Sequence, residues 1–426
     1  MSKKLETTQS FSPIREIRNG IVATKNGDFV KILEFSPINF FLRSGEEQDA
    51  IVDSFKGALR IMPDLVHFKI VSREADVNNF IDGLNRDMAA EPNEKCRALQ
   101  AEQIDLINTV SKMQGVSRHF YLSFAYSLKE GFERRPSFEQ ICRELDMKGN
   151  EIALAMNRCG NEKLSVDQDD NYTKSVIHSI LSRAESAEYS YSDRDKEIRS
   201  KYMEQYNLRQ KWVYPVNDFL APMEIDSRLS PNYMVVDGLY YSYLYVPSGA
   251  YPLRAYSGWL QSLIDIDEGI DIDFWVQKLP IDKIQGKLKY SLRYNKMRAK
   301  ETDDTATDYD DLHAAIDSGY YIKQSLSQGD TFCYMSTVLT VTAPTRNSLI
   351  TRVNGVKNIA LQCGLEYTLM FSQTATTAGT KNRTPVATTI QYIGTAILND
   401  LQFNAPNQDL STASAKFTGS TDLHRA

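Results

Sequence analysis

The sequence has few cysteines, few histidines and no long run of apolar residues. Its five cysteines never form a Cys-x-x-Cys pair, so we expect no disulfide framework and a reducing compartment. No Cys or His pairs stand at the spacing of zinc ligands, and the five cysteines are widely scattered: Cys96, Cys142, Cys159, Cys333 and Cys363. The first, second and last of these lie in helical patterns and Cys333 in a strand pattern, so these four are expected to be small buried side chains. No stretch approaches the roughly 18 apolar residues of a membrane span, and the N-terminus has no apolar signal region.

The sequence also lacks a phosphate-binding loop. The pair Gly286-Lys287 is followed by Leu288 where a Ser or Thr is needed, and Gly379-Thr380-Lys381 has the wrong spacing. No G-x-S-x-G element occurs, and no Ser–His–Asp arrangement can be inferred from spacing. We therefore expect no catalytic, cofactor-binding or metal-binding residues on this chain.

The overall composition is that of an ordinary globular protein. With 42% apolar and 24% charged residues over 426 positions, the chain has material for two or three domains. Its net charge of −6 argues against a protein whose main task is to grip phosphate backbones, so nucleic acid is not an expected partner.

Two acidic runs invite a metal-binding interpretation. The run Asp265–Asp273 departs from a calcium loop because Gly269 and Ile270 stand where a ligand and a glycine are needed. Its alternation of Asp with Ile instead favours a half-exposed strand, with an apolar face formed by Ile270, Ile272 and Phe274. The second run, Asp303–Asp311, is expected to be a solvated loop between two helices.

Other polar and aromatic features favour structural roles. His67 and His119 lie within strand patterns and are expected to pack or to face solvent. The tyrosine-rich segment Leu239–Tyr256 could stack on single-stranded nucleic acid, but Arg254 is its only nearby cation, so a protein-facing or core surface is favoured. The charged segment Glu188–Lys211 resembles an inserted helical region. These two segments are the candidate contact surfaces.

Apolar periodicity predicts alternating strands and helices. Strands are expected at 21–24, 28–35, 65–71, 119–126, 233–246, 270–277, 331–341 and 366–371. Helices are expected at 44–62, 74–112 with a break near 91–92, 137–158, 257–264, 280–297, 312–328 and 344–362.

This order divides the chain into an α+β unit at 1–160, a mainly helical insertion at 161–231, a second α+β unit at 232–373 and a Thr/Ser/Asn-rich, linker-like tail at 374–426. The two units share their element order at an offset of about 200–215 residues. We therefore expect two similar sheet-plus-helices units with long helical excursions, each like a split βαβ (ferredoxin-like) sheet. Simple α/β alternation without duplication would give the same pattern, so both explanations stay open.

Several segments resemble the N-terminal region of the large conjugal-transfer ATPases of type IV secretion systems, the CagE/TrbE/VirB class. In that region a hairpin leads to a Ser-x-x-E-Q element, and the matching positions here are Gly27, Val30, Ile32, Leu33, Phe35, Pro37, Asn39, Phe40, Ser44, Glu47 and Gln48. The segments RHFYLSFAYSL, DFWVQKLP and the strand–helix–strand at 330–373 add to the resemblance, which covers about residues 15–373.

The resemblance implies a non-catalytic docking and scaffold region. In the family a RecA-like ATPase domain follows, and only that domain would bind ATP and Mg²⁺; none of its motifs occur here, so the chain is either a fragment or a shortened family member. The expected partners are inner-membrane components of a secretion channel and sister subunits, in a hexamer for the full protein. The expected location is cytoplasmic, peripheral at the inner face of the membrane.

Two alternatives stay open. One is a self-contained α+β ligand-binding protein or enzyme with a cleft between the two units. The other is a single-strand-binding accessory protein of plasmid transfer, which the acidic charge balance disfavours.

Overall fold

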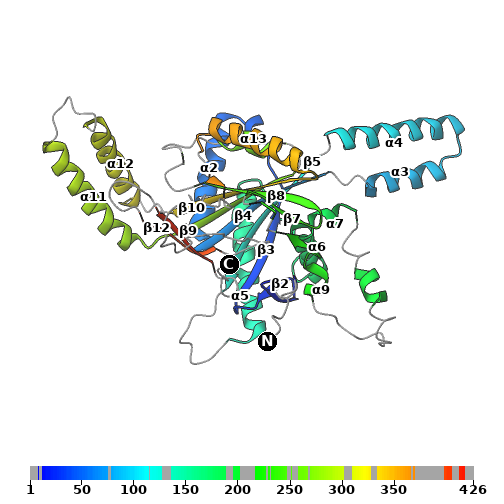
Figure 1. Ribbon diagram of the computed structural model, residues 1–426, viewed down its shortest axis with the longest axis horizontal. Helices are drawn as coiled ribbons and strands as arrows, with labels where there is room; N and C mark the ends of the chain where they lie inside the picture. Colours follow the sequence, from blue (N-terminus) through cyan, green and yellow to red (C-terminus); the bar gives the residue numbers. More distant parts are fainter. Residues whose placement is uncertain are drawn as a thin grey trace, which may run out of the picture.

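Figure 1 shows the computed structural model of the chain. The structure describes residues 8, 12–74, 78–114, 116–126, 136–188, 195–201, 216–226, 229–230, 232–246, 251, 258–266, 269–301, 309–327, 333–365, 368–369, 398–404 and 412–417.

Most strands belong to one large antiparallel sheet, in the order β1-β2-β3-β5-β4-β9-β10-β8-β7-β6, with β11 also paired to β8. A separate hairpin is formed by β12 and β13. The strands are β1 (Ile14–Arg18), β2 (Ile21–Thr24), β3 (Phe29–Phe35), β4 (Leu65–Glu74), β5 (Val116–Tyr126), β6 (Ile225–Asp226), β7 (Met234–Val236), β8 (Leu239–Val246), β9 (Ile270–Lys278), β10 (Cys333–Ala343), β11 (Thr368–Leu369), β12 (Leu398–Asn404) and β13 (Thr412–Phe417).

Helices are inserted between these strands, so the predicted α+β class is confirmed. The helices are the 3₁₀ turn η1 (Phe40–Leu42), α2 (Gly45–Ile61), α3 (Asn78–Ala90), α4 (Glu94–Gln114), α5 (Phe138–Arg158), α6 (Asp170–Leu181), α7 (Arg183–Glu188), α9 (Asn217–Leu220), α10 (Gln261–Ile264), α11 (Ile281–Glu301), α12 (Tyr309–Ser327) and α13 (Arg346–Gln362).

The strand order is the same in both halves of the large sheet. The run β2-β3-β5-β4 meets the run β9-β10-β8-β7, which is the same order read from the opposite edge. We call residues 21–164 the first repeat and residues 234–369 the second repeat. In each one, two parallel strands joined through a helix enclose a third strand, which is the split βαβ arrangement. This is the common order that the predicted duplication requires.

The two repeats are not separate sheets, which corrects the expectation of a sheet in each unit. Strand β4 pairs with β9 from Leu65–Gln277 to Val71–Asp271, so the repeats join edge to edge. An unpaired edge strand exposes backbone N–H and C=O groups, and this pairing satisfies both edges at once. A cleft between the units, which the enzyme alternative needs, is therefore absent along this paired ladder.

The helix that closes each repeat ends in the same way. Gly160 follows α5 and Gly364 follows α13, with φ of 90° and 74°, a conformation that glycine adopts without the strain of a Cβ. The chain then returns to the equivalent strand in both repeats: Lys163 bridges to Phe35 of β3, and β11 pairs with β8. The likeness of the repeats thus extends beyond strand order to the closing turn.

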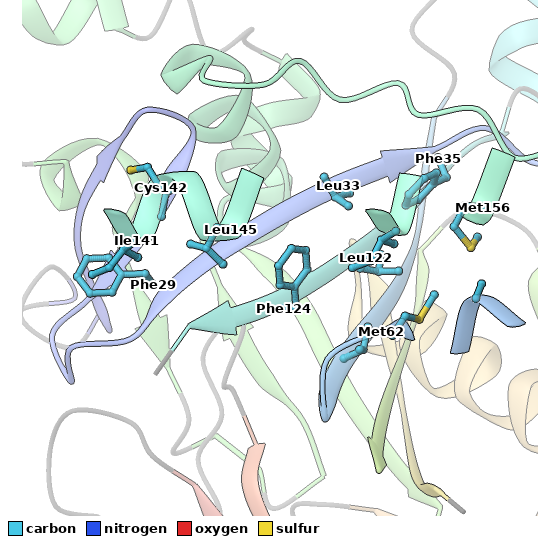
Figure 2. Close-up of a cluster of buried hydrophobic side chains, with 14 of the residues drawn as sticks. Phe29, Leu33, Phe35, Met62, Leu122, Phe124, Ile141, Cys142, Leu145 and Met156 are labelled. Carbon is cyan, nitrogen blue, oxygen red and sulfur yellow. The ribbon is translucent and has the colours of Figure 1, made fainter. Parts of the chain in front are cut away.

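One face of the sheet holds the two large apolar cores. Figure 2 shows the core of the first repeat, where the side chains of β3 and β5 lie beside α5. Its most buried members include Leu33, Leu122 and Ile152. The core of the second repeat is formed mainly by β8, β9, β10 and α13, with Leu244, Leu339 and Val341 inaccessible to solvent. Alternation along each strand sends the intervening residues to the opposite face.

The opposite face is covered in part by the region between the repeats. Helix α6 packs on β1 and β2, and Val176 from α6 contacts Val71 and Tyr121 of the sheet. Figure 1 shows α6, α7 and α9 on the other side of the sheet from α13. The predicted helical insertion at 161–231 thus contains α6, α7 and α9, and residues 195–201 are also helical.

Two helical hairpins extend away from the sheet. We call α3 with α4 the first arm, which connects β4 to β5, and α11 with α12 the second arm, which connects β9 to β10. Figure 1 shows the arms pointing in opposite directions, the first to the right and the second to the left. They occupy equivalent places in the two repeats and correspond to the predicted helical excursions.

Helix starts follow the sequence closely, whereas two strand predictions need correction. Ser44 and Ser137 form capping boxes with Glu47 and Gln140. The single strand expected at 233–246 is instead a hairpin, because Asp237 and Gly238 take φ of 49° and 79° and form a tight turn. Strand β1 was not predicted; it joins β2 through a similar Asn-Gly turn at 19–20.

All five cysteines are free. Cys142 is buried as expected, and Cys159 is also buried, whereas Cys333 and Cys363 are only half-buried. Cys96 is exposed, because it lies on α4 of the first arm, outside the covered faces of the sheet. In the tail, the hairpin of β12 and β13 was not expected from the linker-like composition. No helix within the described ranges is long and apolar enough to cross a membrane.

Candidate functional site

Polar side chains line the paired strands β4 and β9, on the face opposite the large apolar cores. We call this group the seam; its members are His67, Lys69, Arg73, Asp271 and Asp273. Asp271 and Asp273 expose only 4% and 6% of their surface. The expected half-exposed strand is therefore buried on both faces over residues 270–273, because β9 lies in the middle of the sheet, whereas residues 274–278 are partly exposed.

The carboxylate of Asp273 is held by two side chains of the first repeat. Lys69 Nζ donates to both carboxylate oxygens at 2.9 Å, and His67 Nε2 lies 2.8 Å from Oδ1. The His67 ring stacks on Trp275, with centroids 4.6 Å apart. Burial raises the pKa of Asp273, but Lys69 and His67 outweigh it and hold the pKa below its usual value. The seam thus contains an ionised, fully paired carboxylate.

Asp271 joins three segments of the chain. Arg73 Nη1 from β4 and Arg183 Nη1 from α7 donate to its Oδ1 at 2.8 and 3.0 Å. The Ser72 N–H donates to the same oxygen at 3.2 Å. Burial opposes ionisation, yet the two guanidinium groups hold the pKa of Asp271 well below its usual range. This residue therefore ties the first repeat and the region between the repeats to the second repeat.

A third polar cluster lies beside the seam on the same face. Glu34 Oε1 is 2.7 Å from Nδ1 of His119, and the hydroxyl of Tyr172 donates to the other carboxylate oxygen. Burial and the neighbouring carboxylate raise the pKa of Tyr172, which keeps this phenol protonated. The cluster fixes α6 to β3 and β5. His119 is half-buried and ion-paired, a packing role as expected.

The seam includes a Ser–His–Asp contact that sequence spacing could not reveal. Ser123 Oγ lies 3.3 Å from His67 Nδ1, while His67 Nε2 contacts Asp273. Three observations argue against a nucleophilic site. Lys69 neutralises the carboxylate that would orient the histidine; the ring is stacked on Trp275; and the neighbouring backbone N–H groups serve the sheet ladder, leaving no oxyanion donors in mid-strand. We interpret this contact as structural.

The acidic runs, the tyrosine-rich segment and the charged segment that the sequence singled out do not form a binding site among the described residues. Within the described residues, no group of His, Cys, Asp or Glu is placed to hold a metal ion. Strand β8 contains the first part of Leu239–Tyr256, and Tyr241 on it is buried, with a pKa raised to about 12 by burial. The rest of that segment except residue 251, all of Glu188–Lys211 except residues 188 and 195–201, and residues 303–308 of the second acidic run lie outside the described residues.

The first arm exposes large apolar side chains. Ile81 of α3 and Ile104 of α4 are buried within the arm, whereas Leu99 and Leu106 on α4 are 68% and 63% exposed. Their spacing of seven residues places both on one side of the helix. The charges of α4 balance, with three basic and three acidic residues. This arm presents a neutral, partly apolar surface.

The second arm exposes a different surface. Leu292 of α11 and Ile316 of α12 are buried between its helices, and Gly319 lets Leu292 approach closely. On the outside of α11, Tyr290 is 75% exposed and Met297 55% exposed. This helix carries seven Lys or Arg residues and two acidic ones, so its surface is strongly basic.

The exposed surfaces of the two arms were not identified from sequence. Their signals were present as apolar residues at helical spacing on otherwise polar helices. Neither a protein-family model nor a curated protein matches this chain.

Proposed function

We propose that this chain is a non-catalytic docking and scaffold region of a conjugal-transfer (type IV secretion) ATPase. It acts in assembly of the transfer channel or pilus, and so in the transport of DNA or protein. Its partners are inner-membrane components of the channel and sister subunits, and it works at the inner face of the membrane. The resemblance quoted over residues 15–373 supports this proposal.

The observation that carries the docking role is the pair of arms. They leave equivalent places of the two repeats, extend away from the sheet and expose large apolar side chains. Side chains such as Leu99 and Leu106 gain about 1.5–3 kcal/mol each when a partner covers them fully. The two carboxylates of the seam, in contrast, are already paired with Lys69, Arg73 and Arg183.

The test uses donor cells whose only copy of the protein carries Leu99→Glu together with Leu106→Glu. We expect the frequency of plasmid transfer to fall at least about tenfold, because two buried carboxylates oppose docking. The matched control changes Ala98 and Ala101 to Glu; both are exposed, and they lie about 90° and 150° around α4 from the two leucines. Normal transfer by the leucine variant would remove the docking role of the arm, and normal transfer without the protein would remove the proposed function.

A second test concerns catalysis. The purified chain should hydrolyse ATP no faster than background, because no Walker A sequence occurs in it. ATP and Mg²⁺ belong to the RecA-like domain of the family. Sustained ATP turnover that co-purifies with the chain and follows it through variants would contradict the non-catalytic role.

The contact of Ser123, His67 and Asp273 supports one competing function, a hydrolase. In that case a fluorophosphonate probe would label Ser123, and Ser123→Ala would abolish the label. We expect no labelling, since Lys69 holds the aspartate and no oxyanion donors face the serine.

A further inference from the structure

Positive charge is concentrated on one helix of an acidic protein. The chain as a whole has a net charge of −6, yet α11 has seven basic and two acidic residues. The corresponding helix of the first arm is α3, which follows β4 as α11 follows β9, and it has one basic and two acidic residues. The charge therefore distinguishes two arms that are otherwise equivalent in the fold.

The outer face of α11 is basic at its margins and apolar at its centre. At 100° per residue, Leu288 and Leu292 point toward α12, and Tyr290 and Met297 lie on the opposite side. Three exposed cations, Lys289, Arg293 and Lys300, lie along one margin of that centre, and the exposed Lys287 lies on the other margin. Among the described residues, none of these three forms an ion pair.

We propose that this outer face of α11 binds directly to a membrane surface rich in anionic lipids. Exposed tyrosine and methionine between lysines and arginines form the amphipathic pattern of helices that lie in the lipid interface. Each Lys or Arg near an anionic surface contributes about 1 kcal/mol, and apolar side chains add insertion into the acyl boundary. Figure 1 shows that the arm that contains α11 extends away from the sheet.

Nucleic acid is the competing ligand for a basic, tyrosine-bearing helix. Single strands are bound in grooves where bases stack on aromatic rings, whereas the outer face of α11 is the surface of one helix in a hairpin that extends from the sheet. Met297, exposed at the centre of the face, has no stacking ring and is suited to hydrocarbon. These features favour the lipid surface.

This inference deepens the proposed function, because it gives the chain a membrane contact of its own in addition to its partners. The experiment uses the full chain and vesicles of phosphatidylcholine with or without 40% phosphatidylglycerol, roughly a typical anionic content. We expect co-sedimentation with the anionic vesicles, little with the neutral ones, and a decrease as salt rises from about 50 to 300 mM.

Two variants separate the contributions. Lys289→Glu with Arg293→Glu and Lys300→Glu should lower the vesicle partition coefficient more than about tenfold, and Tyr290→Ser with Met297→Ser should lower it less. The control places Lys95→Glu with Arg97→Glu on α4, where both residues are exposed, and should leave binding unchanged. Circular dichroism checks that each variant is folded.

Absence of binding to anionic vesicles would overturn the inference, as would equal losses in the α11 and α4 variants. Binding of a 30-residue oligonucleotide that the α11 charge variant loses, without vesicle binding, would replace lipid by nucleic acid as the ligand. Since the vesicle assay contains no transfer component, its failure leaves the proposed docking function to be judged by the transfer frequency.

Discussion

Asp271 is the single residue on which three segments of the chain meet. Its carboxylate contacts Arg73 and Arg183, both mostly buried. Removing one member of a buried ion network leaves uncompensated charge, which typically costs about 3–5 kcal/mol. We therefore expect Asp271→Asn to lower the free energy of unfolding by about that amount in urea titrations.

The control for this prediction comes from the same acidic run. Asp265 is exposed, and its carboxylate accepts hydrogen bonds from Gln261, so Asp265→Asn should change the free energy of unfolding by less than about 0.5 kcal/mol. A small effect of Asp271→Asn, comparable to that control, would show that the guanidinium groups find other partners or water.

Because the pKa of Asp271 is lowered in the folded protein, its contribution to the free energy of unfolding depends on pH. A carboxylate whose pKa is lowered on folding adds stability above its unfolded value of about 4, and this stability is lost as the pH falls toward the folded value. The arginines stay charged throughout. The stability gap between the natural protein and Asp271→Asn should therefore shrink between about pH 5 and pH 3; a constant gap would contradict the assignment.

For single residues, the sequence showed that Asp and Ile alternate in β9, but it did not show that the aspartates would be buried and paired. The Asp–Ile alternation of β9 gave the correct apolar face, with Ile270 and Ile272 buried, but the aspartates were assigned to solvent. Their partners were visible as Lys69 and Arg73, spaced by four on β4. Two strands with alternating charges of opposite sign can be expected to pair. The neighbouring sequence does not show, however, which strand a run of aspartates will pair with.

The two helices of the second arm each contain a glycine, and the space around the two glycines differs. A Cβ on Gly319 of α12 would lie 2.6 Å from Leu292 Cδ2, whereas a Cβ on Gly286 of α11 would meet nothing within 4 Å. We expect Gly319→Ala to weaken the arm by about 1–3 kcal/mol through overpacking. Gly286→Ala should strengthen it by about 0.5–1 kcal/mol, because alanine favours the helix.

Hydrogen exchange of the amides in α11 and α12 measures both effects. Faster exchange with Gly319→Ala and slower exchange with Gly286→Ala is the expected pattern. If both substitutions slow the exchange, Leu292 can move aside and the close approach is not a constraint.

Helices and turns whose ends are set by capping or helix-breaking residues could be predicted from the sequence. The serine caps of α2 and α5 and the break before α4 are determined by neighbouring residues, and their positions agree with the structure. The turn at Asp237-Gly238 also has a local signal, because an Asp-Gly pair inside an apolar run is typical of a hairpin turn. This pair predicts two strands where a single strand was expected at 233–246. Strand β1 is short and bears alternating charges, so its apolar signal is weak.

For the whole molecule, one sheet shared by two repeats predicts one unfolding transition. The pairing of β4 with β9 covers an edge of each repeat, and Ile70 of the first repeat belongs to the apolar core of the second. Unfolding of one repeat would therefore expose part of the other. We expect amides in β5 and in β10 to lose hydrogen-exchange protection together when Asp271→Asn is introduced. Loss of protection in one repeat alone would show that the repeats unfold independently.

The pairing of the repeats could not be predicted, although their existence could. Element order and offset indicated two similar units, because local periodicity is retained in each. The β4–β9 ladder joins residues about 200 positions apart, and such contacts depend on which edges remain free after each unit has folded. The arms were likewise predicted as helices, but their projection away from the sheet is a property of the assembled fold.

The antiparallel ladder at the centre also has a mechanical consequence. Each arm begins at the C-terminal end of its strand, at Glu74 of β4 and Lys278 of β9, and these ends point in opposite directions. A pull applied between the two arms therefore loads the ladder along the strands, in shear. Hydrogen bonds lie perpendicular to the strands, so they share such a load together and do not open one after another. Force passing through the arms would meet the sheet in its stiffest direction.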